Sequence, residues 1–416
     1  MSNSRAQSDE VKESLRYSLL DGSANAASQG LTQDYITPFA LALKATTAQI
    51  GLLSSAPSLA TALSQLAAPR LSERVGSRKG FILRAVFIQA LLWAPILLIP
   101  YLFPGQKVWW LIGFFTLSTV VGAMTSPAWG SLMADLVPAE MRGRYFGLRG
   151  RICGFVALAL FFIGGLILHF SAADIFLGFS IVFGAALLFR LVSWYFLSKM
   201  YDPPLRMGWW DRYSLPDLVS SLASSNLGRF ITYSSLMSFA TYLASPFFAV
   251  YMLRDLRFDY LTYAVLTAAA SLASLVSLTF WGRRADKLGN VKVVSAASIL
   301  IPLVPLLWLV SHHLYYLIPV QILSGFAWSG FSLASANFVY DASAPENRTR
   351  YIALFNAMNG GSMCLGALLG GYLASHLPPI LGYPLLTLFL VSGLLRGLVA
   401  VVLRRHFSEV RPSVRD

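Results

Sequence analysis

The sequence is poor in charge. Only 12% of its 416 residues are Asp, Glu, Lys or Arg, whereas 56% are hydrophobic, and the mean hydropathy is +0.62. Soluble domains carry about 25% charged residues, so the chain lacks the material for an ordinary water-facing surface. Its long apolar segments instead predict a protein embedded in a lipid bilayer.

Cysteine and several catalytic signatures are scarce or missing. The two cysteines, Cys153 and Cys364, lie in apolar stretches, which argues against a disulfide scaffold. The first 14 residues have no apolar core, so we expect no cleavable signal peptide. The sequence has neither a G-x-x-x-x-G-K-[ST] phosphate loop nor an H-E-x-x-H pair, which argues against an ATP-driven pump and a metalloprotease. We expect no enzyme activity, no cofactor and no bound metal.

Apolar segments of roughly 20 residues recur along the whole chain, each long enough to cross a bilayer. They must be helices, because an open sheet edge cannot survive in hydrocarbon. The sequence therefore predicts an all-α membrane protein with twelve transmembrane helices near 17–43, 48–70, 81–103, 109–134, 146–169, 174–197, 227–252, 260–281, 293–311, 315–340, 352–375 and 382–403.

The 32 basic residues exceed the 19 acidic ones, and their placement is uneven. The two tails and the loops on their side of the predicted spans hold 25 of the cations. The opposite side holds Lys44, Lys107, Arg254 and Arg257. This asymmetry predicts that both termini lie in the cytoplasm. The protein would then be located in the inner or plasma membrane. The asymmetry also explains the positive charge without a nucleic-acid partner.

The longest connection between spans divides the chain into two halves. It contains Trp209 and Trp210 beside cations, which is typical of a segment lying at the inner membrane interface. We predict a cytoplasmic tail at 1–14, a six-helix bundle at 15–198, an interfacial linker at 199–226, a second six-helix bundle at 227–403 and a cytoplasmic tail at 404–416.

The two halves resemble one another. ADLVPAEMRGRYFG after the fourth span matches YDASAPENRTRYIA after the tenth, so that Asp135, Arg142 and Arg144 align with Asp341, Arg348 and Arg350. RLSERVGSRK after the second span similarly matches WGRRADKLGNVK after the eighth, apart from a shift of seven residues. The second copy holds four cations and one acid around two glycines, between two apolar runs.

Twelve spans in a repeat of six, with such glycine-containing charged loops, resemble the major facilitator superfamily over the whole chain. The resemblance implies two pseudo-symmetric six-helix bundles and a secondary transporter that works by alternating access. The first loop departs from the motif, because Pro69 replaces a glycine and Glu73 an aspartate. Paired acids and bases would clasp the cytoplasmic side, although fixing topology is an alternative role. The predicted gating residues are Glu73, Arg74, Gly76, Lys79, Gly282, Asp286, Lys287, Gly289, Lys292, Asp135, Arg142, Asp341 and Arg348.

The first span is unusually polar for a membrane helix. Asn25 and Gln29 share one helix face with Asp21, and such a face should line a cavity rather than contact lipid. Asp34 lies four residues before Pro38, which cannot donate to the Asp34 carbonyl. We therefore predict a kink there and a substrate or coupling role for Asp34; Asp21 is the alternative.

Further polar or aromatic residues of the second half are candidates for the substrate site, with helix packing as the alternative. They are Tyr233, Trp328, Ser332 and Asn356. Arg190 and Arg396 are interpreted as snorkelling to the inner interface. The glycines of the eleventh span, Gly366, Gly370 and Gly371, predict close helix approach. The proline that precedes such glycines in drug antiporters of the family is absent.

We therefore predict a secondary transporter of a small organic solute, coupled to a proton or another cation and functional as a monomer. Many aromatic residues and few buried charges favour a neutral or amphiphilic solute over a multiply charged anion. A drug or metabolite efflux antiporter remains an alternative, as does a non-transporting membrane receptor or scaffold.

Overall fold

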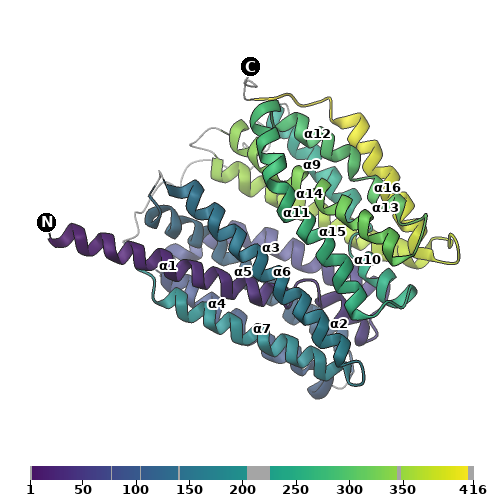
Figure 1. Ribbon diagram of the computed structural model, residues 1–416, viewed down its shortest axis with the longest axis horizontal. Coiled ribbons are helices and arrows are strands. Elements are labelled where there is room, and N and C mark those ends of the chain that lie inside the picture. The colour runs from purple at the N-terminus through teal and green to yellow at the C-terminus, as the bar shows by residue number, and fades with distance from the viewer. Residues whose placement is uncertain are drawn as a thin grey trace. The chain divides into compact units, whose positions relative to one another are not determined.

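Each predicted span coincides with one helix or with one interrupted helix in the computed structural model. The structure describes the backbone of residues 2–75, 77–103, 105–138, 141–203, 225–343 and 348–410, and among these the side chains of all but 2–9, 65–75, 143 and 348–350. The helices are α1 (Ser2–Gly30), α2 (Ile36–Ala42), α3 (Thr47–Val75), α4 (Arg78–Leu102), α5 (Lys107–Leu136), α6 (Arg142–Phe170), α7 (Ile175–Ser198), α9 (Asn226–Tyr242), α10 (Phe247–Val250), the π-helix η2 (Tyr251–Asp255), α11 (Tyr260–Leu288), α12 (Asn290–Leu300), α13 (Leu303–Leu307), α14 (Leu314–Ala342), α15 (Arg348–His376) and α16 (Pro384–Leu403) (Figure 1).

By length and composition alone, ten helices of the described chain could cross a membrane. The first two predicted spans are not among them. Nevertheless α1 and α3 have 29 residues each, about 43 Å at 1.5 Å per residue. The first predicted tail is also not separate, because α1 already begins at Ser2.

Three of the predicted spans are interrupted, each close to a proline. The regular α-helical hydrogen-bond pattern is interrupted at residues 31–35 between α1 and α2, at 243–246 before α10, and at 301–302 before α13, although Leu243, Ile301 and Pro302 keep helical dihedral angles. Pro38, Pro246 and Pro302 stand at these places, and proline both lacks the N–H and clashes with the preceding turn. The predicted kink in the first span is present, a few residues earlier than Pro38.

Side-chain caps define where several helices begin. Ser77 accepts a hydrogen bond from the backbone N–H of Gly80 at the start of α4, and Asp259 accepts one from Thr262 at the start of α11. Such caps satisfy the free N–H groups of a first turn. Gly289 joins α11 to α12 with a φ of 89°, a conformation that side-chain-bearing residues rarely adopt.

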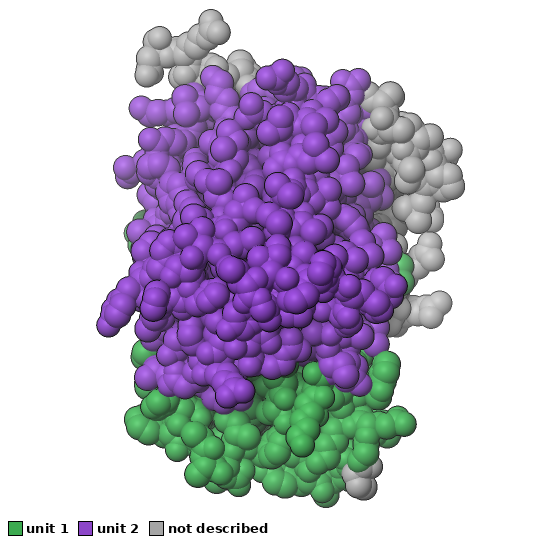
Figure 2. Space-filling view, turned by 90° about the vertical axis from the view of Figure 1, so that its right-hand side faces the viewer, with its two compact units in different colours: residues 1–45, 63–208 green, residues 46–62, 209–416 purple. Residues whose placement is uncertain are grey.

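The chain forms two compact units, which Figure 2 shows in different colours. Unit 1 comprises residues 1–45 and 63–208, and unit 2 comprises 46–62 and 209–416. Helix α3 is therefore divided, and its first part clusters with unit 2, where the hydroxyls of Thr47 and Ser375 lie 2.8 Å apart.

Helix packing repeats from one unit to the other. In unit 1, α1 packs against α6 and α7, and α4 packs against α5 and α7. In unit 2, α9 packs against α15 and α16, and α12 packs against α14 and α16. These are the same pairs in the order of the predicted repeat, so this part of the packing is pseudo-symmetric between the two units. The division of the chain into two six-helix bundles at the predicted bounds stays a prediction, because α3 is shared between the units.

The segments that follow the last helix of each unit are fixed to that unit. The backbone N–H of Tyr201 donates to the Ser14 hydroxyl at 2.8 Å. In unit 2, Ser408 and Asn226 exchange two hydrogen bonds of 2.8 and 2.9 Å. Phe407 is buried in the main core of unit 2. The predicted C-terminal tail is thus docked up to residue 410.

Candidate functional site

Arg190 on α7 is held inside unit 1 by neutral side chains from three other positions. Its Nε donates to Gln89 at 2.8 Å, and its Nη1 donates to Asn25 at 2.6 Å and to Ser193 at 3.2 Å. Arg190 is only 7% exposed. The interpretation that it snorkels to the interface is therefore wrong, because the side chain turns into the bundle and its donors are used there.

Asp21 on α1 lies beside this arginine and is 4% exposed. It accepts a 2.7 Å hydrogen bond from the Ser193 hydroxyl, which links it to Arg190. The second cation near it is Arg149 of α6, whose Nη2 lies 3.7 Å from the carboxylate. One carboxylate is thus placed between two guanidinium groups that come from different helices.

Arg149 is positioned by a hydrogen bond and by two packing contacts. Its Nε donates to the backbone carbonyl of Ser18 at 3.2 Å, and its Cζ lies 4.4 Å from the ring centroid of Trp129. The guanidinium also packs against α1 at Gly22, where a Cβ would overlap it. Glycine at this position is what allows the two helices to bring Arg149 and Asp21 together.

This cluster lies about two helical turns inside the ends of α6 and α7, two helices long and apolar enough to cross a membrane. Arg149 follows the start of α6 by seven residues and Arg190 precedes the end of α7 by eight, which is about 10–12 Å at 1.5 Å per residue. Ionisable groups at such depth are costly and are kept mostly for transport pathways or proton relays. We therefore take Asp21, Arg149 and Arg190 as the core of the candidate site.

Unit 2 has a buried arginine at the matching position of its last helix. Arg396 is 2% exposed and donates to Ser392 at 3.1 Å and to the Thr241 carbonyl at 3.2 Å. Ser392 in turn donates to the Ala240 carbonyl. Snorkelling is wrong for Arg396 as well. In the described part of the chain no carboxylate lies within 4.0 Å of it.

The predicted polar residues of α15 and α14 divide into buried and exposed ones. Asn359, which lies one turn from the predicted Asn356 on the same face of α15, is buried, and it accepts from Ser234 and Ser238 of α9 at 3.0 and 2.7 Å. Asn356 and Ser332 are exposed in unit 2. Neither has a side-chain hydrogen bond that would build a site.

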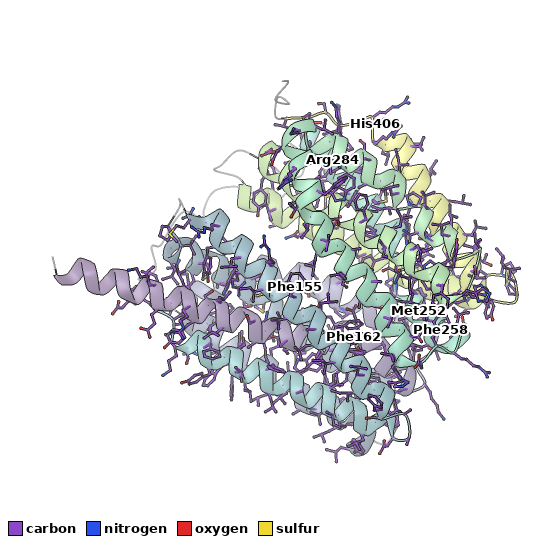
Figure 3. The ribbon with its side chains drawn as sticks, viewed as in Figure 1. Phe155, Phe162, Met252, Phe258, Arg284 and His406 are labelled. Carbon is purple, nitrogen blue, oxygen red and sulfur yellow. The ribbon has the colours of Figure 1, made fainter. Side chains whose placement is uncertain are left out.

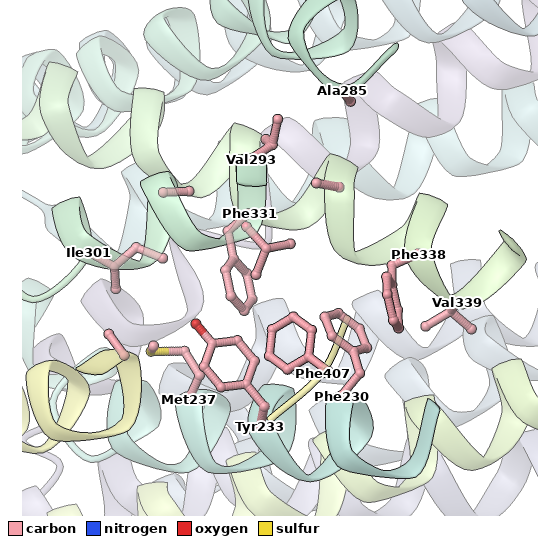
Figure 4. Packing of buried hydrophobic residues seen from close by; sticks show 14 of the residues in the cluster. Phe230, Tyr233, Met237, Ala285, Val293, Ile301, Phe331, Phe338, Val339 and Phe407 are labelled. Carbon is pink, nitrogen blue, oxygen red and sulfur yellow. The ribbon is translucent and has the colours of Figure 1, made fainter. Parts of the chain in front are cut away.

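Tyr233 and Trp328 belong to the packing of unit 2. Tyr233 is 1% exposed, contacts the ring of Phe331 and hydrogen-bonds with Ser298 (Figure 4). Trp328 packs on the same core cluster, 5.6 Å from the Phe331 ring. Their predicted role in substrate binding is therefore not supported by these contacts, and the alternative of ordinary packing describes them.

The remaining predicted residues of the first span lie at its polar face. Asn25 is part of the Arg190 cluster. Gln29 is exposed in unit 1, and Asp34 is exposed in the interruption between α1 and α2. The polar residues predicted on the first span therefore lie in two places. Asp21 and Asn25 belong to the charged cluster, and Asp34 lies beyond it.

At the end of unit 1 where α4 begins, an ion pair is made by Arg78, a residue that was not among the predicted gating residues. Arg78, the first residue of α4, donates to Asp135 at 2.7 Å and to Ser131 at 2.8 Å. The predicted cation Lys79 instead donates to the Met200 carbonyl at 2.6 Å. The repeat of the two loops aligned Lys79 with Lys292, one residue after the cation that makes the ion pair, and so did not indicate Arg78.

Unit 2 repeats this contact without the positive charge. Asn290, the first residue of α12, donates to Asp341 at 2.9 Å. Glu409 of the C-terminal segment accepts from the backbone N–H of Val291 at 2.8 Å and lies against Gly289. An ion pair in one unit therefore corresponds to a neutral amide contact in the other.

The other predicted gating residues make few contacts. Arg142 donates to the backbone carbonyls of Ala134 and Val137. Arg284 of α11, which Figure 3 labels, was not among the predicted residues, and its guanidinium lies over the Phe280 ring. Asp286, Lys287 and Lys292 are exposed, and Gly282 lies near Leu333. Gly76 and the side chains of Glu73, Arg74 and Arg348 lie outside what the structure describes. The clasp between the halves stays a prediction, since all these contacts lie inside one unit.

Solved structures of several transporters are similar to this chain in fold. An aspartate-to-alanine mutant of the nucleoside transporter NupG matches with a TM-score of 0.75 and 13% identity, over 95% of this chain and 100% of that one. A D-xylose–proton symporter matches at 0.68 and 12%, over 96% and 98%. A bacterial homologue of the lysosomal transporter Spinster matches at 0.65 and 15%, over 98% and 99%.

The sequence comparisons are consistent with this fold. No curated protein matches the sequence significantly. The sequence profile described as Major Facilitator Superfamily matches residues 23–211 and 230–415, which includes both units and nearly the whole chain. The chain therefore belongs to the major facilitator superfamily and is a multi-pass membrane transporter, not an enzyme.

Proposed function

We propose that this secondary transporter moves a small organic solute by alternating access and couples that movement to protons through Asp21. The observation that carries the proposal is the carboxylate of Asp21, buried in the bundle between Arg149 and Arg190. A D-xylose–proton symporter has the same fold, which provides a precedent for proton coupling in this architecture.

Protonation of Asp21 changes what its neighbours can bind. The ionised carboxylate attracts Arg149 and accepts from Ser193. A neutral carboxyl attracts a guanidinium far less, so a proton on Asp21 releases Arg149 for another partner. A coupling free energy of about 1–3 kcal/mol between proton and solute is typical of linked sites.

Asp34 is the alternative coupling acid. It lies in the interruption between α1 and α2, where a polar backbone and a carboxylate occur together, and half-helix ends of this kind hold ions in other transporters. We favour Asp21 because two cations and a hydroxyl are arranged around it.

The matched variants Asp21→Asn and Asp34→Asn separate these two assignments. In proteoliposomes with an inward or outward pH gradient, we expect Asp21→Asn to abolish gradient-driven accumulation of solute while exchange without a gradient persists. Asp34→Asn should keep gradient-driven accumulation within about twofold of the unaltered protein. Full proton-driven accumulation by Asp21→Asn would overturn the assignment, and its loss only in Asp34→Asn would transfer the role to Asp34.

We also propose that both termini lie in the cytoplasm, on the strength of the 25 cations on their side against four on the other. A reporter enzyme that is active only outside the cell should be active when fused in the loop before α14, near His313, and inactive when fused at either terminus. The reverse pattern would invert the orientation.

A further inference from the structure

The charged cluster of unit 1 has more positive than negative groups. Two guanidinium groups, Arg149 and Arg190, surround the single carboxylate of Asp21. The other titratable groups that interact with this cluster are the Tyr145 phenol and the Cys153 thiol of α6, which are neutral at physiological pH. The cluster therefore carries one excess positive charge at a depth where an uncompensated charge is costly.

The two arginines differ in how far their donors are used. Arg190 donates to three neutral oxygens and is almost completely buried. Arg149 uses Nε for the Ser18 carbonyl, whereas Nη2 is 3.7 Å from Asp21, too long for a hydrogen bond. Among the described residues none accepts a hydrogen bond from either Nη atom of Arg149, and its side chain is 18% exposed. The unused donors thus belong to the more accessible cation.

The guanidinium of Arg149 is also held in place before any ligand binds. It packs against the Trp129 ring and against the backbone at Gly22, while the Ser18 carbonyl fixes Nε. This leaves the two Nη groups as an ordered fork, a geometry that matches the two oxygens of a carboxylate. Preorganisation of this kind reduces the entropy lost on binding.

From these observations we infer that the transported solute is an organic monocarboxylate, and that its carboxylate binds the Nη fork of Arg149. The inference rests on the proposed coupling role of Asp21, because the solute carboxylate and the Asp21 carboxylate compete for the same guanidinium. Binding of the solute therefore favours a proton on Asp21, and the same competition makes proton and solute move in the same direction.

The charge balance supports this pairing. Without ligand, one ionised Asp21 and two arginines leave one positive charge. With ligand, a neutral Asp21, two arginines and one solute carboxylate leave the same charge. The proton removes the negative charge of Asp21 and the solute carboxylate supplies another, so the net charge of the bundle does not change. A dianion would bring the cluster to zero net charge, so that the loaded and the empty states would differ in charge, and a neutral solute would leave the Arg149 fork unpaired.

A binding assay on the purified full-length protein in detergent tests the inference without leakage across a bilayer. The probes are monocarboxylates, each paired with its neutral amide: benzoate with benzamide, nicotinate with nicotinamide, and gluconate with gluconamide, together with inorganic phosphate as a second oxyanion. We expect at least one carboxylate to raise the thermal midpoint in a saturable way while its amide and phosphate do so weakly. If no carboxylate stabilises the protein more than its amide, or phosphate is preferred, the inference is wrong.

Variants of α6 provide the residue-level test. Arg149→Gln should weaken carboxylate binding about 10- to 100-fold, and Arg149→Lys by less, because lysine keeps the charge but not the fork. Gly22→Ala should also weaken binding by displacing the guanidinium. Arg151→Gln is the matched control, since Arg151 is exposed on the same helix, and it should bind normally. Unchanged affinity in Arg149→Gln would overturn the assignment.

Proton uptake distinguishes this inference from the proposed function. In weakly buffered solution, carboxylate binding to the unaltered protein should take up protons, and Asp21→Asn should bind without doing so. Carboxylate binding through Arg149 without proton uptake would preserve the solute assignment and remove Asp21 coupling. Proton-driven transport of a neutral solute that is insensitive to Arg149→Gln would preserve Asp21 coupling and overturn the monocarboxylate assignment.

Discussion

Replacing Arg190 with methionine should lower the free energy of unfolding by about 3–5 kcal/mol. Methionine approximates the length of the side chain but leaves the oxygens of Gln89, Asn25 and Ser193 without their donor inside the bundle. Asp21 would also lose one of the two cations around it. The thermal midpoint of the purified protein in detergent should therefore fall by roughly 10 °C.

Two further arginine variants serve as controls for this prediction. Arg190→Lys keeps the charge and one donor, so its loss of stability should be intermediate. Arg396→Met should destabilise unit 2 less, because Arg396 has only Ser392 and one backbone carbonyl as partners and no nearby carboxylate among the described residues. An effect of Arg190→Met no larger than that of Arg396→Met would show that the Arg190 cluster does not stabilise the bundle as argued.

Gly370→Ala should disrupt the packing of α15 against α9. A Cβ at Gly370 would overlap the backbone carbonyl oxygen of Leu243 and would lie 3.0 Å from the Phe247 ring. Backbone atoms cannot move aside as the end of a side chain can, so the helices must separate. We expect a loss at the upper end of the ~1–3 kcal/mol that is typical of overpacking, seen as a lower thermal midpoint and less folded protein.

The same helix supplies a matched control. Gly361 also lies on α15, but a Cβ there would meet nothing within 4 Å. Gly361→Ala should therefore be neutral or stabilising by up to about 1 kcal/mol, because alanine has the higher helix propensity. Equal losses from both variants would mean that general helix properties, rather than the contact with Leu243, explain the effect of Gly370→Ala.

The close approach at Gly370 is a feature that sequence reasoning could predict. Glycines spaced by four residues in an apolar segment are typical of closely packed membrane helices. Gly366 contacts the last turn of α9, and Gly370 contacts the segment that follows it. The spans and the repeat of the halves could likewise be predicted from the sequence, because apolar length and cation placement are local properties. The broken helices could be predicted only in part, since a proline indicates the region of an interruption but not the residues where it begins and ends.

The contacts at the first residues of α4 and α12 show how a small error of register in aligning the loops hides a residue that makes an ion pair. The repeated loops align acids, glycines and lysines well, which directed attention to Lys79 and Lys292. The structure pairs Arg78 with Asp135 and Asn290 with Asp341, because each stands at the first position of its helix. Which cation points into the bundle depends on helix rotation, and charge composition does not specify it.

The sequence by itself determined the membrane environment, the helical class, the repeat of six spans and the family resemblance, because these follow from hydropathy, cation placement and motifs along the chain. Only the tertiary structure decided which polar side chains form a site. Asp21, Gln89, Arg149 and Arg190 lie on four different helices, and Arg190 and Arg396 could as well have reached the interface. Their inward direction comes from acceptors that distant helices bring within hydrogen-bonding distance, and such partners are defined by packing rather than by neighbouring residues.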